Sequence, residues 1–333
     1  MRIDVYRIGF VKRDKFDYHL KIHMKRVGFL TNHISYGGTE VALYDYAHYN
    51  ETLLGNTSVV LTRDMRTTNV EIYEKFSKRF KVLYIKSQPD IDRIVREQRL
   101  HVLYVIKSGE KDWFTTRACK CIIHCVFTTR YPHGDIYCAI SPALNELHKT
   151  NVPILPHMIT VEYHSESFRT ELTIPSDALV IGRYGSYDSF DIPFVYSAII
   201  EILTANPSAF FIAMNTKPFA YHSRIVYIPR TTDAFVKRKF INTCDVMLHA
   251  RQRGETFGLS CGEFAVCEKP IVTYGLSTER AHIEVLGSAC TQYTTKNELV
   301  DIFATDGWKK NMQSNGYMNF TPARVMKTFS FLL

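Results

Sequence analysis

The sequence lacks any long apolar run, since no window approaches 18 uninterrupted apolar residues, the length of a membrane-spanning helix. The initial stretch MRIDVYRIGFVKRDKF is basic, but no apolar core followed by a small-residue cleavage site is present. We therefore expect neither secretion nor membrane spanning. Low-complexity runs and internal repeats are also missing, so the whole chain is expected to fold.

Charge and cysteine usage indicate a compartment and a class of partner. The eight cysteines lie mostly inside apolar runs such as CKCIIHC and DIYCAI, which is typical of buried thiols in a reducing compartment. We expect a cytoplasmic protein. The 41 Lys and Arg residues against 33 Asp and Glu residues give a net charge of +8, which favours nucleotides, anionic lipid surfaces or nucleic acid as partners. A solvated basic surface without a specific partner explains the charge equally well.

The 333 residues suffice for two domains, and the pattern of apolar segments divides accordingly. Short apolar runs alternate with amphipathic stretches, which predicts strands and helices around a parallel sheet. The first set of predicted strands begins at residues 26, 58, 81, 101, 121 and 135, with helices at 71–80 and 90–98 and a last helix capped by Ser141.

A second set of predicted strands begins at residues 178, 209, 224, 245, 270 and 289, with helices at 193–205, 233–242 and 259–268. Between the two sets, Pro153 and Pro156 favour a linker within residues 152–165. We therefore predict an α/β protein with two Rossmann-like domains, 1–158 and 159–333, whose sheets face each other across a deep cleft. The stretch after Trp308 is expected to return to the first domain. Ligands should bind in the cleft.

The most informative segment is HARQRGETFGLSCGEFAVCEKPIVTY, from His249 to Tyr274, which follows a predicted strand and opens a helix. Backbone N–H groups of Phe257, Gly258 and Leu259 would lie at the helix N-terminus, where unpaired donors and the helix dipole favour an anion such as a diphosphate. Glu255 precedes the helix and Glu263 lies one turn inside it. Both carboxylates can therefore face one ligand, and carboxylates bind sugar hydroxyls well.

This segment resembles the E-x7-E motif of family 4 glycosyltransferases, which are retaining enzymes with the two-domain GT-B fold. The resemblance implies that Glu255 contacts hydroxyls of the transferred sugar and that Glu263 binds the ribose of the nucleotide. It extends over residues 26–303, although only the stretch around Glu255 is specific. The alternative is that both glutamates are merely capping and surface carboxylates.

The segment TNHISYGGTEVALYDYA provides a second candidate anion site directly after the first strand. Gly37 and Gly38 supply a flexible turn, and Thr39 is expected to cap the following helix. The segment resembles the glycine loop that faces the donor pyrophosphate in the same family. A Gly-Gly turn before a helix is otherwise often only a turn.

His124 lies in the predicted strand CIIHCVF, where the resemblance implies a histidine near the transferred sugar. Without the resemblance, a buried core histidine is the simpler interpretation. A zinc site of His124 with Cys119, Cys121 and Cys125 is not expected, because strand alternation places the cysteines and the histidine on opposite faces.

Arg183 follows the first strand of the second domain, where a guanidinium can neutralise a diphosphate leaving group. Family members usually carry a Lys in an R-x4-K pattern, and this sequence has none at the equivalent place. Arg251, Arg253 or Lys217 are candidates for the second positive charge, although each is also a candidate surface residue.

The resemblance implies transfer of a sugar from a UDP- or GDP-sugar to a glycan or another hydroxyl acceptor, with retained anomeric configuration. No carboxylate is clearly placed as a nucleophile, so we expect front-face displacement. No D-x-D pair follows a strand in a loop, so neither a metal nor another cofactor is expected. A peripheral contact with an anionic membrane is compatible with the charge, whereas nucleic acid is not the expected partner.

Two alternatives stay open. A glycosyltransferase acting on DNA bases would suit the positive charge. A non-catalytic protein that binds nucleotide sugars would suit the missing Lys.

Overall fold

The computed structural model describes residues 24–63 and 69–333. The expectation for the initial stretch MRIDVYRIGFVKRDKF lies outside the described residues. Within the described ranges, no helix combines the length and the apolar character needed to cross a membrane.

The first sheet contains six parallel strands: β1 (Arg26–Thr31), β2 (Thr57–Thr62), β3 (Lys81–Tyr84), β4 (Val102–Lys107), β5 (Lys120–Cys125) and β6 (Ile136–Ala139). Their order across the sheet is β3-β2-β1-β4-β5-β6. Every residue of β4 is buried, as expected for a central strand covered by helices on both faces. The strand order reverses between β1 and β4, and the loop after β1 therefore opens at a switch point where such sheets bind ligands.

The first half of the chain adds these helices to the sheet: α1 (Gly38–Thr52), α2 (Val70–Arg79), α3 (Gln88–Glu97) and α4 (Pro142–His148). The predicted cap at Ser141 is present, since its Oγ accepts a hydrogen bond from the Leu144 N–H at 3.3 Å. The predicted cap at Thr39 is wrong. Helix α1 starts two residues before the start that a Thr39 cap implies, Gly37 occupies the N-cap position, and no side chain caps the helix.

The second sheet contains β7 (Val180–Tyr184), β8 (Phe210–Met214), β9 (Ile225–Ile228), β10 (Val246–His249), β12 (Ile271–Tyr274) and β14 (Cys290–Tyr293). Their order is β14-β12-β10-β7-β8-β9, which repeats the order of the first sheet read from the opposite edge. The helices of this half are α5 (Pro193–Ala205), α6 (Ala234–Thr243), α7 (Leu259–Val266), α8 (Ala281–Leu286) and α9 (Lys296–Ala304). The switch point lies between β7 and β10, so the loops after these two strands border the ligand side.

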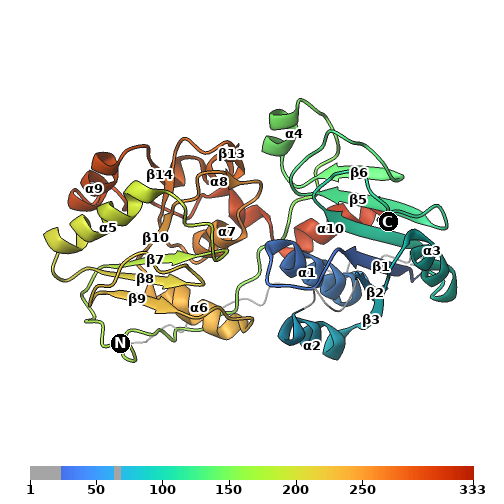
Figure 1. Ribbon diagram of the computed structural model, residues 1–333, viewed down its shortest axis with the longest axis horizontal. Coiled ribbons are helices and arrows are strands. Elements are labelled where there is room, and N and C mark those ends of the chain that lie inside the picture. Colours follow the sequence, from blue (N-terminus) through green and yellow to red (C-terminus); the bar gives the residue numbers. More distant parts are fainter. Residues whose placement is uncertain (1–23, 64–68) are drawn as a thin grey trace, which may run out of the picture.

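Two separate parallel sheets, each with its own helices, confirm the predicted fold class (Figure 1). The C-terminal helix α10 (Pro322–Leu332) lies against the first sheet rather than the second. Its Phe329 ring packs against Phe29 of β1 and Tyr46 of α1, with ring centroids 6.2 and 5.2 Å apart. The end of the chain, which follows the second half in sequence, therefore packs against the first half and buries aromatic surface there.

One small sheet was not predicted from the sequence. Strand β11 (Gly254–Glu255) pairs in parallel with β13 (Glu279–Arg280). Gly254 has φ +83°, and a Cβ at this position would come within 2.0 Å of the Glu279 carbonyl oxygen. Only glycine permits this close approach, which fixes the backbone at Glu255.

Candidate active site

An open cavity of about 740 Å³ lies between the two halves, within the size range of small-molecule sites. Its first-domain wall includes the loop after β1, one face of α1, part of α2 and residues that follow β5 and β6. Its second-domain wall consists of the loops after β7 and β9, the start of α6, and the segment from Arg251 to Glu263. The residues predicted from the sequence that line it are Gly37, Gly38, Arg251, Glu255, Phe257, Gly258, Leu259 and Glu263.

The two glycine segments face each other across this cavity. A Cβ added to Gly38 would lie 3.2 Å from Cδ1 of Leu259, the first residue of α7. The N-termini of α1 and α7 therefore approach the same region of the cleft. Both present unpaired backbone N–H groups there, which favours an anion between them.

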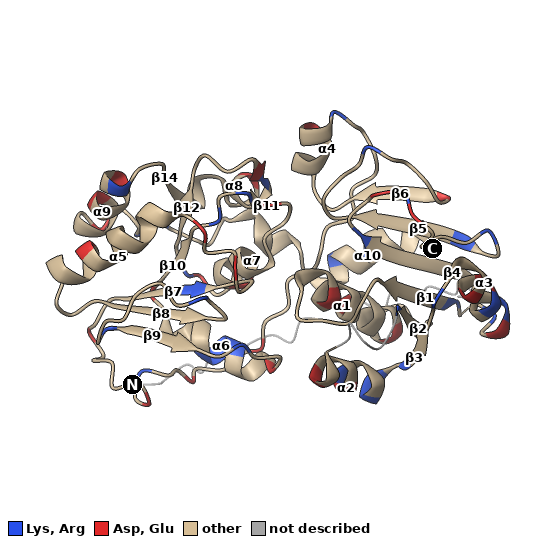
Figure 2. Ribbon diagram, in the orientation of Figure 1, with Lys and Arg blue, Asp and Glu red and all other residues tan. Residues whose placement is uncertain are grey.

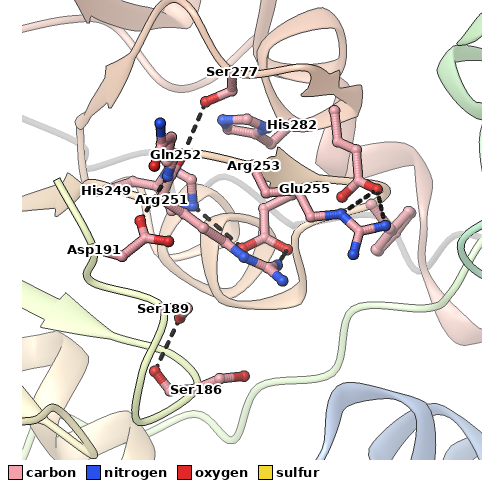
Figure 3. A network of polar contacts seen from close by, with 12 residues as sticks. Ser186, Ser189, Asp191, His249, Arg251, Gln252, Arg253, Glu255, Ser277 and His282 are labelled. Atoms are coloured by element: carbon pink, nitrogen blue, oxygen red, sulfur yellow. Dashed lines mark hydrogen bonds and ion pairs between the residues drawn. The ribbon is translucent and has the colours of Figure 1, made fainter.

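Glu255 is held by two basic side chains (Figure 3). Its Oε2 accepts a hydrogen bond from Nη1 of Arg251 at 2.9 Å, and its Oε1 lies 3.3 Å from Nε2 of His249. Burial by itself would raise the pKa of Glu255, but the hydrogen bond with His249 and the charge of Arg251 outweigh burial and lower the pKa to about 2. The carboxylate is therefore ionised at any working pH and acts as an acceptor.

A chain of polar side chains behind Glu255 was missed by the sequence reasoning. Nδ1 of His249 lies 2.9 Å from Oγ1 of Thr273, which lies 3.0 Å from Nε2 of His282. Since an ionised Glu255 can only accept, Nε2 of His249 donates to it. In neutral His249, Nδ1 then accepts from the Thr273 hydroxyl, which in turn accepts from His282. The only sequence signal was a histidine at the end of a strand.

Glu263 lies in α7 and is buried, with a side chain that is 6% exposed. Its Oε1 forms an ion pair with Nζ of Lys237 from α6, and its Oε2 has no hydrogen-bond partner among the described residues. Burial alone would lower the pKa of Lys237, but the charge of Glu263 outweighs it and raises the pKa. Lys237 was also missed, because nothing in the sequence of α6 separates it from the adjacent basic residues Arg238 and Lys239.

Gly258 occupies the N-cap of α7 in the left-handed region, with φ +85°. A Cβ at this position would lie 2.9 Å from Oη of Tyr317 and 3.0 Å from Cβ of His282. Tyr317 donates a hydrogen bond to the carbonyl of Phe257, so the loop is also fixed from the far side.

We expect Gly258→Ala to destabilise the protein by about 1–3 kcal/mol, because backbone strain and a close contact add together. Gly55→Ala is the matched control, since Gly55 has φ +66° but no atom within 4 Å of the added Cβ. Denaturant unfolding of both variants measures the difference. An equal loss of stability in both would show that close packing at Gly258 contributes nothing.

The structure does not bring His124 into the cleft. Its imidazole is fully buried, Nδ1 lies 2.6 Å from Oη of Tyr104, and the residue does not line the cavity. Burial lowers the pKa of His124 to about 3, so the ring is neutral. His157 of the linker lines the cavity instead, with its ring centroid 5.3 Å from that of Phe257. A lone histidine after Pro156 offered no sequence signal for this placement.

Arg183 is likewise turned away from the cleft. The whole residue is 3% exposed. Its guanidinium donates hydrogen bonds at 2.6–2.9 Å to the Asn215 carbonyl, Thr216 Oγ1, the Ser186 carbonyl and Ser189 Oγ. Burial lowers the pKa of Arg183 to about 10, against the opposing effect of Glu255. It does not line the large cavity, but it borders, with Glu255, a small one of about 10 Å³ behind it. The sequence places Arg183 correctly after β7 but could not reveal the direction of its side chain.

Asp45 adds a titratable group to the first-domain wall. Its Oδ2 accepts a hydrogen bond from Oγ1 of Thr160 at 3.5 Å. Burial raises the pKa of Asp45 to about 7, although Lys237 and Lys75 act in the opposite direction. The carboxyl therefore keeps its proton in the folded state over a pH range in which the unfolded chain has released it.

This difference predicts that the free energy of unfolding falls as pH rises from about 4 to about 7. In that range the folded state holds a proton on Asp45 that the unfolded chain has released. Asp45→Asn cannot titrate. We expect it to match the wild type at pH 4.5 and to be more stable by about 1–4 kcal/mol at pH 8. Urea unfolding at the two pH values checks this, and a constant difference between the proteins at both would contradict it.

Solved structures share this fold. Alr3699/HepE from Anabaena in complex with UDP and glucose matches with a TM-score of 0.70 and 14% identity, covering 93% of this chain and 99% of that chain. A glycosyltransferase from Rickettsia africae matches with a TM-score of 0.69 and 12% identity over 93% and 98%. A UDP-N-acetylglucosamine 2-epimerase candidate from Listeria monocytogenes matches with a TM-score of 0.61 and 13% identity over 92% and 95%.

No family model and no curated protein sequence matches this chain. The two sheets and the solved structures show that the chain has the GT-B fold, which is shared by proteins with different reactions. The function must be argued from the site.

Proposed function

We propose that this protein is a glycosyltransferase that moves a sugar from a nucleoside diphosphate sugar to a hydroxyl acceptor. The observation that carries the proposal is the placement of Glu255 and Glu263 in one interdomain cavity, on either side of the N-terminus of α7. Carboxylates suit the hydroxyls of a sugar and a ribose, and the helix N-terminus suits the diphosphate between them. The complex of Alr3699/HepE with UDP and glucose supports a ligand of this class.

We also propose a family, a mechanism and separate roles for the two glutamates. The protein would belong with the retaining family 4 enzymes, with Glu255 on the transferred sugar and Glu263 on the ribose. Transfer would proceed by front-face displacement, in which the departing diphosphate assists removal of the acceptor proton. We further propose that the protein is cytoplasmic, that its acceptor is a glycan, and that it makes a peripheral contact with anionic membranes.

A divalent metal is not needed in this proposal, because side chains and the helix N-terminus would meet the diphosphate charge. We expect the transfer rate to be the same in buffer with EDTA as in buffer with Mg²⁺. A rate that falls with EDTA and returns with Mg²⁺ or Mn²⁺ would contradict metal independence.

The charges around the cavity bear on the DNA-base alternative. Among the described residues that line it, Lys75, Arg230, Lys237 and Arg251 face the acidic residues Glu40, Asp45, Glu162, Glu255 and Glu263. Figure 2 likewise shows basic and acidic residues distributed over both halves. A duplex would require a continuous basic groove, so this mixed surface favours a small donor over DNA.

A thermal-shift screen of UDP-, GDP- and ADP-sugars tests the proposal. A ligand at 100 times its dissociation constant adds about 2.7 kcal/mol of stability, which is readily measured. Release of nucleoside diphosphate from the sugar nucleotide that stabilises the protein would then establish transfer or hydrolysis. Binding without turnover would favour the non-catalytic alternative, and interconversion of sugar epimers would favour an epimerase.

A further inference from the structure

The diphosphate of the proposed donor needs positive charge, and the residue expected to supply it is already engaged. Arg183 uses its two terminal nitrogens for four hydrogen bonds to its own domain and does not line the cavity. The Lys that usually accompanies it is missing from the sequence. Arg253 is paired with Glu279, and neither Arg253 nor Lys217 lines the cavity.

Four other cations line the cavity in the described part of the chain, and two of them lie over aromatic rings. The Arg230 guanidinium lies 3.8 Å from the ring centroid of Tyr36, and Nζ of Lys75 lies 4.8 Å from that of Tyr44. Both contacts are to rings of the first domain. Nζ of Lys237 also lies 5.8 Å from a ring centroid, that of Tyr184 in its own domain. Arg251 and Lys237 are distinguished by their position, because each lies directly beside one of the two glutamates.

Arg251 and Lys237 each pair with one of those glutamates. Among the described residues, the guanidinium of Arg251 makes one hydrogen bond, to Glu255, and Nζ of Lys237 makes one, to Glu263. A guanidinium has five N–H donors and an ammonium three, so both cations have donors left for a ligand. Their side chains are 24% and 16% exposed, against a buried Arg183.

A donor molecule places its diphosphate between the sugar and the ribose. With the sugar at Glu255 and the ribose at Glu263, the diphosphate passes between the two ion pairs, near the N-terminus of α7. We propose that Arg251 and Lys237 carry the negative charge of this diphosphate, and that Arg183 positions the loop after β7 instead. This inference rests on the proposed function. It replaces the usual clamp by Arg251, which was among the candidates from the sequence, and by Lys237, which the sequence did not single out.

Calorimetry with UDP and GDP, each compared with its nucleoside, and with inorganic pyrophosphate tests the assignment. We expect Arg251→Met and Lys237→Met each to weaken binding of the nucleoside diphosphate by about 10- to 100-fold, the range for a lost charged hydrogen bond. Nucleoside affinity should change by less than about twofold. Pyrophosphate binding should weaken in both variants, and Lys237→Arg should recover most of the affinity.

Two further variants separate charge from structure. Lys217→Met removes a cation of the same domain that lies outside the cavity, and it should change neither affinity. Arg183→Met should lower the melting temperature while leaving the ratio of diphosphate to nucleoside affinity unchanged. Lys237→Met leaves Glu263 without its ion-pair partner and could therefore unfold the protein. In that case the double variant Lys237→Met with Glu263→Gln keeps the charge balanced. The measured quantity is again the ratio of diphosphate to nucleoside affinity.

The inference is overturned if Arg183→Met collapses the affinity ratio while Arg251→Met and Lys237→Met preserve it. In that case the wild type still binds the nucleoside diphosphate, and the proposed function stands. If the wild type binds neither diphosphate more tightly than its nucleoside, the proposed function and this inference both fail.

Discussion

Replacing Glu255 by alanine is expected to lower the rate constant of sugar transfer by about 10² or more, while the nucleoside diphosphate still binds. The transferred sugar changes geometry and charge during the reaction, so a carboxylate that contacts it stabilises the transition state more than the ground state. The structure makes this carboxylate a fixed charge, because His249 and Arg251 hold it. Its loss should therefore affect turnover rather than nucleotide affinity.

The measurement compares the transfer rate with the affinity for nucleoside diphosphate by calorimetry. Glu201→Ala, which removes an exposed glutamate paired with Lys296 in the same domain, is the control and should leave both unchanged. Circular dichroism establishes that each variant folds. Near-normal turnover of Glu255→Ala would remove Glu255 from the reaction.

Replacing Glu263 by alanine is expected to raise the donor KM by about tenfold or more and to change kcat by less than about threefold. The ribose is bound similarly in the ground state and the transition state, so a lost ribose contact weakens both equally. Glu263 also neutralises Lys237 in a buried position, and the variant should therefore be less stable.

Glu263→Gln retains the shape of the side chain and serves as the comparison for the stability effect. Affinity for the nucleoside should fall together with affinity for the nucleoside diphosphate, because the ribose is common to both. If Glu255→Ala and Glu263→Ala weaken nucleotide binding equally and leave the same kcat, the assignment of separate roles is wrong.

The elements of both sheets could be predicted because their signals are local. Continuous apolar runs such as that of β4 are typical of strands covered on both faces, and apolar residues at helical spacing indicated α2 and α3. The spacing of Glu255 and Glu263 across a loop and one helical turn likewise placed both at the start of α7. The predicted strands reappear within two residues of their expected starts.

Contacts between distant segments had no such signal. The pair of β11 with β13 joins residues that are 25 apart, and the hydrogen bond between His249 and Thr273 joins residues that are 24 apart. Helix α1 began earlier than the Thr39 cap implied, because glycine at the N-cap competes well with a threonine further along.

By itself the sequence determined that two parallel α/β domains form, and that two carboxylates flank a helix N-terminus. Both follow from residue periodicity and from spacing along one short segment, which depend on neighbours in the chain. The tertiary structure alone decided which side chains reach the cleft. Arg183 and His124 find partners inside their own domains, whereas Lys237, Arg251 and His157 face the cavity. The direction of a side chain depends on the acceptors and the space that distant segments provide, and no local pattern encodes these.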